Sequence, residues 1–476
     1  MVSKSSSEQS EQAQSSQPPL RYYGGIPGAL APFLFFVAGV ITLALSGAPD
    51  ERGFWPILVG ALVLGLLLAR DRNAYCEAAV KGMSQPLLAI MILAWTLASV
   101  IGVLMSATGF VEALIWCASQ MQLGGAGFVP ASFLICCLVS ASTGTSFGTI
   151  LICGPILYPA GGVLGADLAL LAGAILGGAT FGDSISPISD TTIASALSQK
   201  ADIGGTVRSR LKYVLPAAAV ALVLFGAVGA LVGSGNPAGA AGLSGDPRGL
   251  PMILVPLVVL MLLLRGRHLL HGLLIGLLAG TLLGLVAGLL PAERLLSLDP
   301  ENFVARSFVI EGIDRALGIS IFTFFLLGLV ATLEASGILE KLVERARRFS
   351  RSARSAEVQI VAAAGLAVLL TTHSIVAILT AGEFARRTGE RFGLHRYRRA
   401  NLLDLTVVTF PFLLPYCIPV ILAGSITASG AAHGIPPVSP LSVGLHNFYS
   451  WAILAVLIFS LVTGFGRRFF RDQKPD

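Results

Sequence analysis

The stretch FGDSISPISDTT, from Phe181 to Thr192, ends a run of Ala, Leu, Ile and Gly that carries no charge after Asp167. Within twelve residues it holds two aspartates, a proline and five hydroxyl side chains. A soluble loop carries such residues at little cost, whereas a segment inside a bilayer must compensate every polar group. The surroundings of this stretch therefore decide the fold.

The composition is that of a polytopic membrane protein. Of 476 residues, 54% are hydrophobic and 12% are charged, and the mean hydropathy is +0.80; soluble proteins have a charged fraction of about 25%. Apolar runs long enough to cross about 30 Å of hydrocarbon recur from Ala29 to Phe465. Residues 1–28 begin with a Ser- and Gln-rich stretch and are expected to form a disordered tail, without the basic and apolar parts of a secretory signal.

Several function classes are disfavoured by the sequence. The net charge of +6 lies in short loops beside apolar runs, which indicates membrane topology rather than binding to nucleic acid. No GxxxxGK[ST] phosphate loop occurs, which argues against a pump driven by ATP. The six cysteines form no CxxC pair, and His268 and His271 lack further ligands nearby, so we expect no cofactor and no metal beyond a transported cation.

Basic loops indicate how the chain is threaded. Loops after about residues 70, 200, 265 and 338 and the C-terminal tail are rich in Lys and Arg, which places them in the cytoplasm by the positive-inside rule. Arg208, Arg210 and Lys212 are counted in one of these loops. We therefore expect an integral protein of a bacterial-type inner membrane with both termini in the cytoplasm.

Two apolar runs are expected to be re-entrant hairpins. The run Val358 to Ala381 is long enough to span, but Lys and Arg flank it on both sides, so a turn at TTHS keeps both flanks in the cytoplasm. The alternative is an ordinary helix with one misplaced loop. A counterpart in the first half turns at STGTS and enters from outside. The expected hairpin tips are Ser142, Thr143, Gly144, Thr145, Ser146, Thr371, Thr372, His373 and Ser374.

Each hairpin is preceded by one spanning helix and followed by two, and the two sets have opposite orientation. The predicted fold is therefore all-α, with about ten transmembrane helices plus two re-entrant hairpins in an inverted repeat with broken helices. Chance agreement of loop charges is the alternative. The predicted divisions are 1–28, a cytoplasmic tail; 29–84, an N-terminal helix pair; 85–234, transport repeat 1; 235–316, linking helices; 317–466, the inverted transport repeat 2; and 467–476, a cytoplasmic tail.

The opening stretch has the chemistry of an ion site. An ionised aspartate near the bilayer centre costs about 2.5 to 3.5 kcal/mol, so Asp183 and Asp190 need a proton, a cation or a partner. Pro187 breaks the helix and frees carbonyls, which with the hydroxyls offer the oxygen ligands that a hard cation prefers. The alternative is a surface loop in which Asp190 caps the next helix. The candidate cation- and proton-binding residues are Asp183, Asp190, Ser186, Ser189, Thr191, Thr192 and Asp404.

The segment GGATFGDSISPISDTT resembles the signature of the NhaC-type sodium/proton antiporters. Weaker similarity extends through STGTS, DIGGTVRSRLKYVLP and NLLDLTVVTFPFLLPY and covers most of the chain from about residue 85. The resemblance implies exchange of sodium for protons, with Asp183 and Asp190 as the matching acids and Asp404 as the acid of the second-half motif. The chain departs from the family at Ser184, where lysine is usual, and at Ile193, where asparagine is usual. Related carriers exchange small organic acids, so the departures bear on the substrate.

Three further features allow two interpretations each. Asp404 opens a run with prolines at every fourth position from Pro411, and it is either the acid of the second repeat or a partner of a nearby arginine. His373 either relays protons or binds a carboxylate, or it is structural. Glycines at every fourth position from Gly272 to Gly288 let a helix approach closely, either in the same chain or in a second protomer of a homodimer.

The expected function is a secondary antiporter that exchanges sodium for protons at the paired aspartates, with the lipid bilayer and small ions as partners and no enzymatic activity. The main alternative is a sodium- or proton-coupled carrier of a small organic anion or amino acid. A channel is the next alternative, because hairpins with polar tips also build filters. An intramembrane enzyme is the third, with Ser142 or Ser374 beside His373 as the only hint of a nucleophile and a base.

Overall fold

A computed structural model of the chain describes most of residues 19–470. The expectations for residues 1–18, for the basic stretch 342–351 and for the last residues, 471–476, lie outside the described part. The described residues are 19–46, 51–121, 124–187, 189–232, 245–265, 267–299, 304–338, 341 and 352–470.

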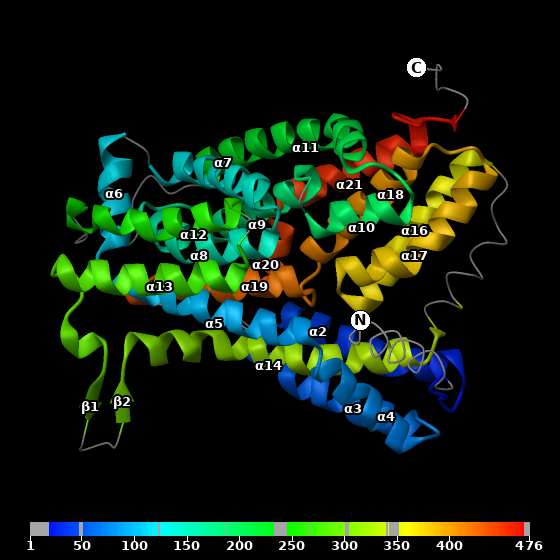
Figure 1. Cartoon of the computed structure of the whole chain (residues 1–476), viewed down its shortest axis with the longest axis horizontal. Coiled ribbons are helices and arrows are strands. Elements are labelled where there is room, and N and C mark those ends of the chain that lie inside the picture. Colours follow the sequence, from blue (N-terminus) through cyan, green and yellow to red (C-terminus); the bar gives the residue numbers. More distant parts are fainter. Residues whose placement is uncertain are drawn as a thin grey trace, which may run out of the picture.

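Helices make up nearly all of the regular structure, and most of them run along the long axis of the molecule (Figure 1). The described residues contain a single sheet, the antiparallel pair β1 (Ser297–Asp299) and β2 (Val304–Arg306), at one end. Nine helices in the described ranges are long and apolar enough to cross a membrane. The prediction of an all-α polytopic membrane protein is confirmed.

The first set of helices follows the predicted order. The spanning helix α5 precedes a hairpin, and after the hairpin come a broken helix and another long helix. The break follows from Pro187, which has no backbone N–H to donate, and from Ser186, which ends the helix in an extended conformation. These elements are α5 (Pro86–Ala107), the hairpin α7 (Gly125–Thr143) and α8 (Ser146–Val163), the broken pair α9 (Leu168–Ile185) and α10 (Asp190–Ser198), and α11 (Ile203–Val232).

The second set repeats this order. Its first helix begins at Phe308, earlier than the expected Leu317, and the break lies in the proline-rich stretch 408–417. The two hairpins enter the molecule from opposite ends of its long axis, as an inverted repeat requires (Figure 1). The elements are α14 (Phe308–Ala335), the hairpin α16 (Ala353–Thr371) and α17 (Ser374–Arg391), the broken pair α18 (Arg396–Val407) and α19 (Ile418–Ile426) with η5 (Phe410–Phe412) between them, η6 (Thr427–His433), α20 (Pro440–Leu445) and α21 (Phe448–Thr463).

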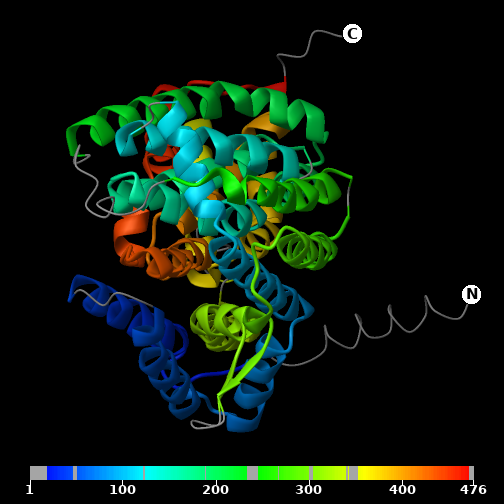
Figure 2. The same cartoon turned by 90° about the vertical axis from the view of Figure 1, so that its left-hand side faces the viewer.

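The remaining helices lie at the edges of the two repeats. Seen from one end, the N-terminal helices and α14 form a group beside the rest of the bundle (Figure 2). The glycine stripe of α13 packs within the chain, because a Cβ at Gly276 would touch Val259 and one at Gly280 would touch Leu104. The stripe therefore gives no support to a homodimer. These helices are α2 (Ile26–Leu45), η1 (Glu51–Phe54), α3 (Trp55–Leu68), α4 (Arg72–Met83), α6 (Phe110–Gln120), η2 (Pro247–Ile253), α12 (Leu254–Leu264), α13 (Leu269–Val286) and η3 (Ala292–Arg294).

Glycines on α9 hold the first hairpin against the broken helix. A Cβ at Gly178 would lie 2.5 Å from the carbonyl oxygen of Phe133, and one at Gly182 would lie 2.1 Å from the carbonyl carbon of Ser140. The backbones of α7 and α9 are therefore in contact. Ser140 Oγ strengthens this contact by donating a hydrogen bond of 2.8 Å to the carbonyl of Gly178. The packing brings the end of α9 to the hairpin turn.

We predict that Gly182→Ala destabilises the protein. The added methyl group meets the α7 backbone rather than a movable side chain, and overpacking of this kind costs about 1 to 3 kcal/mol. Thermal unfolding in detergent measures the effect. Gly226→Ala in α11 is the control, because nothing lies within 4 Å of its added Cβ and alanine favours helix. Equal melting temperatures for the two variants would contradict the close packing of α7 on α9.

Candidate functional site

The two hairpin turns and the break in α9 surround one cavity of about 210 Å³. Segments from both repeats thus meet, although they are far apart in the sequence. The surrounding helices add an apolar wall from α5, α13 and α19. The polar residues that line the cavity are Thr145, Ser146, Asp183, Ser189, Asp190, Thr191, Thr372, His373 and Ser374.

The first hairpin turn presents a helix N-terminus to a carboxylate. Gly144 has φ 69°, in the left-handed region, and Thr145 caps α8 by accepting a hydrogen bond from Gly148 N–H. The amide of Ser146, in the first turn of α8, donates to Asp183 Oδ1 at 3.1 Å. A helix N-terminus favours negative charge, so the turn stabilises the ionised form of Asp183.

The second hairpin turn is more strained and touches the other broken helix. Thr372 has φ 54°, which a threonine rarely adopts, and such strain is often found at functional sites. Ser374 Oγ donates to the carbonyl of Val407, the last residue of α18, at 2.8 Å. His373 lines the cavity, and its buried Nδ1 has no hydrogen-bond partner among the described residues. The turn is thus bonded to the end of α18, while His373 Nδ1 remains available to a ligand.

Asp183 is buried at the break of α9 with hydroxyls around it. Only 7% of its surface is exposed. Ser189 Oγ lies 3.5 Å from Asp183 Oδ1 and 3.1 Å from Thr191 Oγ1. Thr192 Oγ1 donates to the main-chain carbonyl of Asp183 at 3.1 Å. Carboxylate, hydroxyl and cavity therefore occur together, as the motif predicts for an oxygen-lined site.

Of the other expected site residues, some line the cavity and the rest do not. Asp190, at the start of α10, is exposed and lines the same cavity as Asp183. Ser186 is buried but does not line the cavity. Ser142 and Thr143 donate back to their own helix, at the carbonyls of Leu138 and Val139, and lie outside the cavity lining. Thr371 likewise bonds to the carbonyl of Ala367. These three hydroxyls close the hairpin arms rather than face the cavity.

Asp404 does not line the cavity and already has a cationic partner. Its carboxylate lies 2.7 Å from Arg210 Nη1, and both side chains are fully buried. Arg210 also donates to the main-chain carbonyl of Ser184 at 3.0 Å and to Thr192 Oγ1 at 2.8 Å. The ion pair therefore joins α11 of the first repeat to α18 of the second at the break of α9. Asp404 is thus paired with an arginine, but this arginine is distant in the sequence and the pair is fully buried, unlike the partnership with a nearby arginine that was considered.

The assignment of Arg210 to a cytoplasmic loop is wrong. Helix α11 begins at Ile203, so Arg210 is two turns inside it, on the face that packs against the bundle. A signal was available in the sequence, because Thr206, Arg210, Tyr213 and Ala217 recur at helical spacing on that face, and all four are buried. The topology prediction assigned every charged residue outside an apolar run to a loop. Helix α11 begins before its apolar run, so Arg210 was assigned to a loop although it lies in the helix.

A second buried ion cluster anchors the other hairpin. Glu357 on α16 is fully buried and lies 2.8 Å from Arg398 Nε and 2.8 Å from Arg467 Nη2. Arg398 also donates to Tyr213 OH at 2.8 Å and to Ser460 Oγ at 2.7 Å. The base of the hairpin is thus tied to α18, α11 and α21. None of these roles was predicted.

We predict that neutralising one partner of the Arg210 and Asp404 pair destabilises the fold more than neutralising both. Asp404→Asn leaves a buried guanidinium without its carboxylate, and breaking a buried pair costs about 3 to 5 kcal/mol. The double variant Arg210→Met with Asp404→Asn removes both charges and should recover part of the loss. Thermal unfolding in detergent measures each variant, with the exposed Arg208→Met as control. Strictly additive losses would contradict the coupling.

Comparison with known proteins gives matches to part of the chain. The sequence profile described as the Na+/H+ antiporter family matches residues 28–230. The malate-2H+/Na+-lactate antiporter of Bacillus subtilis is 36% identical over 176 residues, which are 37% of this chain and 37% of that protein. The Na+/H+ antiporter NhaC of Alkalihalophilus pseudofirmus is 31% identical over 172 residues, 36% of this chain and 37% of that one.

A longer match has lower identity. An uncharacterized Na+/H+ antiporter of Haemophilus influenzae is 22% identical over 364 residues, which cover 71% of this chain and 74% of that protein. The alignments to the Bacillus subtilis and Alkalihalophilus pseudofirmus proteins span 37% of each of those proteins, little more than a third. The matched range 28–230 contains the first hairpin, Asp183, Asp190 and Arg210. Residues 28–230 thus match the Na+/H+ antiporter family, and this match confirms the resemblance to NhaC-type antiporters that the motif predicted.

Proposed function

We propose that the protein is a secondary antiporter that exchanges sodium for protons at Asp183. The observation that carries the proposal is the buried Asp183 carboxylate, held between the first hairpin turn and the break of α9 in a cavity of about 210 Å³. A carboxylate in an apolar layer needs a proton or a cation. Asp190, on the same cavity, adds negative charge that attracts a cation. The family match of residues 28–230 supports secondary transport.

Competition for Asp183 couples the two fluxes. A sodium ion is attracted by the carboxylate and has the hydroxyls of Ser189 and Thr191 nearby as oxygen ligands. Protonation removes the charge that attracts the ion. Either species neutralises the buried acid, whereas the empty, charged site is costly to move through an apolar layer. Because the site switches sides mainly when it is loaded, net exchange follows.

Asp404 has a different role in this proposal from the one first expected. Arg210 already compensates its charge, so Asp404 holds the two repeats together and does not exchange ions. Asp183 and Asp190 are then the acids that face the transported ion. Ser186 and Thr192 contribute through the backbone geometry of the break rather than as ligands.

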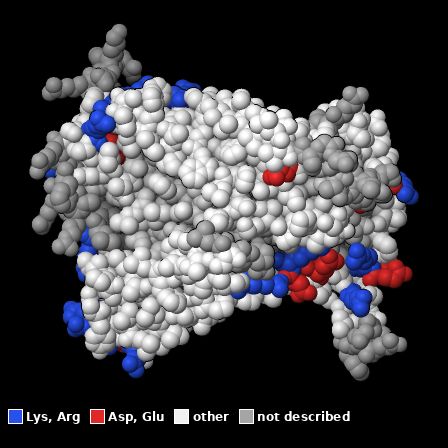
Figure 3. Space-filling model, turned by 180° about the vertical axis from the view of Figure 1, so that it is seen from behind, with Lys and Arg blue, Asp and Glu red and all other residues white. Residues whose placement is uncertain are grey.

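The distribution of charge supports a protein that spans the bilayer of a plasma membrane. Charged side chains gather toward the two ends of the molecule, and the face between them is largely uncharged (Figure 3). The end that holds Arg396 and Arg468 also holds the last described residues of the chain. We infer that this end is cytoplasmic, as the positive-inside rule indicates.

The two serines considered as nucleophiles both donate to main-chain carbonyls. Ser142 Oγ donates to the carbonyl of Leu138 and Ser374 Oγ to the carbonyl of Val407. Neither serine is bonded to the histidine, so the arrangement expected of a nucleophile and its base is not formed.

A second candidate is a carrier of a small organic anion coupled to sodium or protons. The cavity is larger than a single ion needs, and the N-termini of α8 and α17 both border it at Ser146 and Ser374. Helix N-termini bind carboxylates, and His373 Nδ1 is free to bond to one. A relative with partial similarity is named for malate and lactate exchange. In this proposal Asp183 binds the coupling ion and the anion fills the rest of the cavity.

We predict that Asp183→Asn abolishes sodium-driven proton movement. The measurement is the pH of dye-loaded proteoliposomes after addition of sodium, lithium or potassium.

Asp190→Asn keeps exchange but weakens the apparent sodium affinity about tenfold, because it removes an attractive charge worth about 1.4 kcal/mol. Asp167→Asn is the control, since Asp167 caps α9, lies outside the cavity and keeps its capping role as asparagine.

Two results would overturn the proposal. Full exchange in Asp183→Asn would show that the motif is only a structural break. Absence of proton movement with any cation in the parent would exclude ion exchange. Uptake of a labelled hydroxycarboxylate driven by a sodium gradient then tests the second candidate, with Asp183→Asn expected to lose the sodium dependence.

A further inference from the structure

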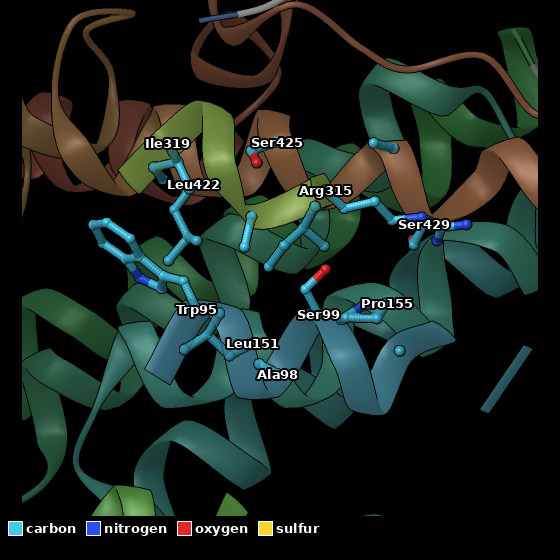
Figure 4. A pocket seen from close by; sticks show the side chains of 14 residues that line it. Trp95, Ala98, Ser99, Leu151, Pro155, Arg315, Ile319, Leu422, Ser425 and Ser429 are labelled. Atoms are coloured by element: carbon cyan, nitrogen blue, oxygen red, sulfur yellow. The ribbon is translucent and has the colours of Figure 1, made fainter. Parts of the chain in front are cut away.

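A second, smaller cavity lies behind the first, among α5, α8, α14 and the segment α19 to η6. Its volume is about 30 Å³, enough for about two water molecules or one small ion (Figure 4). Trp95 and Leu151 line both cavities and therefore form the wall between them. The smaller cavity is thus next to the ion site but contains none of its acids.

The polar groups of this cavity are an arginine and three serines. Ser429 is only 6% exposed, and its Oγ has no hydrogen-bond partner among the described residues. Arg315 extends along the rim with its guanidinium beside Ser429, and the hydroxyl of Ser99 points into the space (Figure 4). Ser425 completes the set. The hydroxyl of Ser429 is therefore free to donate to a ligand in the cavity.

The charge around the cavity is positive. Arg315 Nη2 lies 2.5 Å from Glu311 Oε1, and Arg294 Nη1 lies 3.6 Å from the other oxygen of the same carboxylate. Two arginines therefore share one acid, which leaves a formal charge of +1 on the three side chains. Asp314 is exposed and does not line the cavity. Of the donors on Arg315, only Nη2 has a recorded acceptor within the described ranges.

We propose that this cavity binds a small monovalent anion, either a halide or the carboxylate of a small organic acid. Arg315 supplies the charge, and the hydroxyls of Ser99, Ser425 and Ser429 donate hydrogen bonds to the anion. Glu311 orients the guanidinium through Nη2 and leaves its other donors for the ligand. Trp95 separates the bound anion from Asp183 in this conformation, so the site is distinct from the ion-exchange site.

Close packing between helices gives the cavity a fixed shape. A Cβ at Gly102 would lie 2.7 Å from Pro155 Cβ, and one at Gly154 would lie 2.5 Å from Ile426 Cγ2. Helices α5, α8 and α19 therefore approach closely around it. A preformed pocket loses little freedom on binding, which favours a specific anion over loosely held water.

The test is a titration of anions into the full-length protein in lipid nanodiscs, with tryptophan fluorescence as the readout. Chloride or acetate replaces sulfate at constant ionic strength. Trp95 borders both cavities, so its fluorescence reports an anion in either, and variants of Arg315 assign the signal to the smaller cavity. Trp95→Phe identifies its share of the signal among the four tryptophans. We expect a saturable change in the parent. Because binding is measured without a gradient, the result does not depend on whether the protein exchanges sodium.

Matched variants assign the site. Arg315→Gln should weaken binding at least about tenfold. Arg294→Gln removes the other partner of Glu311 and with it the net positive charge, but from outside the cavity, so it should weaken binding by a smaller factor than Arg315→Gln. Arg315→Lys retains the charge and should bind more tightly than Arg315→Gln. Ser429→Ala removes a hydroxyl without a protein partner, so it should fold normally and weaken binding about fivefold.

The outcomes separate the two sources of the anion. A saturable response to acetate but not to chloride indicates an organic acid, and a response to chloride with or without acetate indicates a general small-anion site. A response that does not saturate, or that is the same in Arg315→Gln as in the parent, would overturn the proposal.

Discussion

Backbone groups that leave helical hydrogen bonding inside an apolar layer must find partners within the protein, and this constraint organises the centre of the molecule. The break at Pro187 leaves the carbonyl of Ser184 to accept from Arg210. The hairpin turn leaves the amide of Ser146 to donate to Asp183. In each case a backbone group without a helical hydrogen bond is paired with a charged side chain from another helix. The breaks and the buried charges therefore depend on each other.

The two repeats share their helix order but differ in electrostatics. In the first, the acid at the break faces a cavity that can receive a cation. In the second, Asp404 faces an arginine that belongs to the first repeat. In the proposed mechanism the pair removes one acid from the set that exchanges ions, and it joins the two halves across their interface. The two repeats therefore have similar backbones, but only the acid of the first repeat faces the cavity.

Contacts with neighbouring helices hold both hairpins in position, ionic ones for the second hairpin and close packing for the first. Glu357 ties the base of the second hairpin to two arginines, and glycines on α9 let the first hairpin lie against the broken helix. The tips themselves make few bonds to each other. A cavity bounded by firmly anchored arms and lightly bonded turns suits a site whose ligands must enter and leave.

Local sequence determined the features that depend on neighbouring residues. Pro187 broke the helix because it has no N–H, and basic flanks marked the second hairpin. Asp183 and Asp190 predicted an ion site because acids in an apolar run need compensation. Only the tertiary structure decided which charge compensates which. Arg210 and Asp404 are 194 residues apart, and the side chains of Ser142 and Thr143 turn back on their helix although they belong to the predicted tip. Pairing of this kind depends on which helix faces pack together, and sequence spacing along one helix does not contain that information.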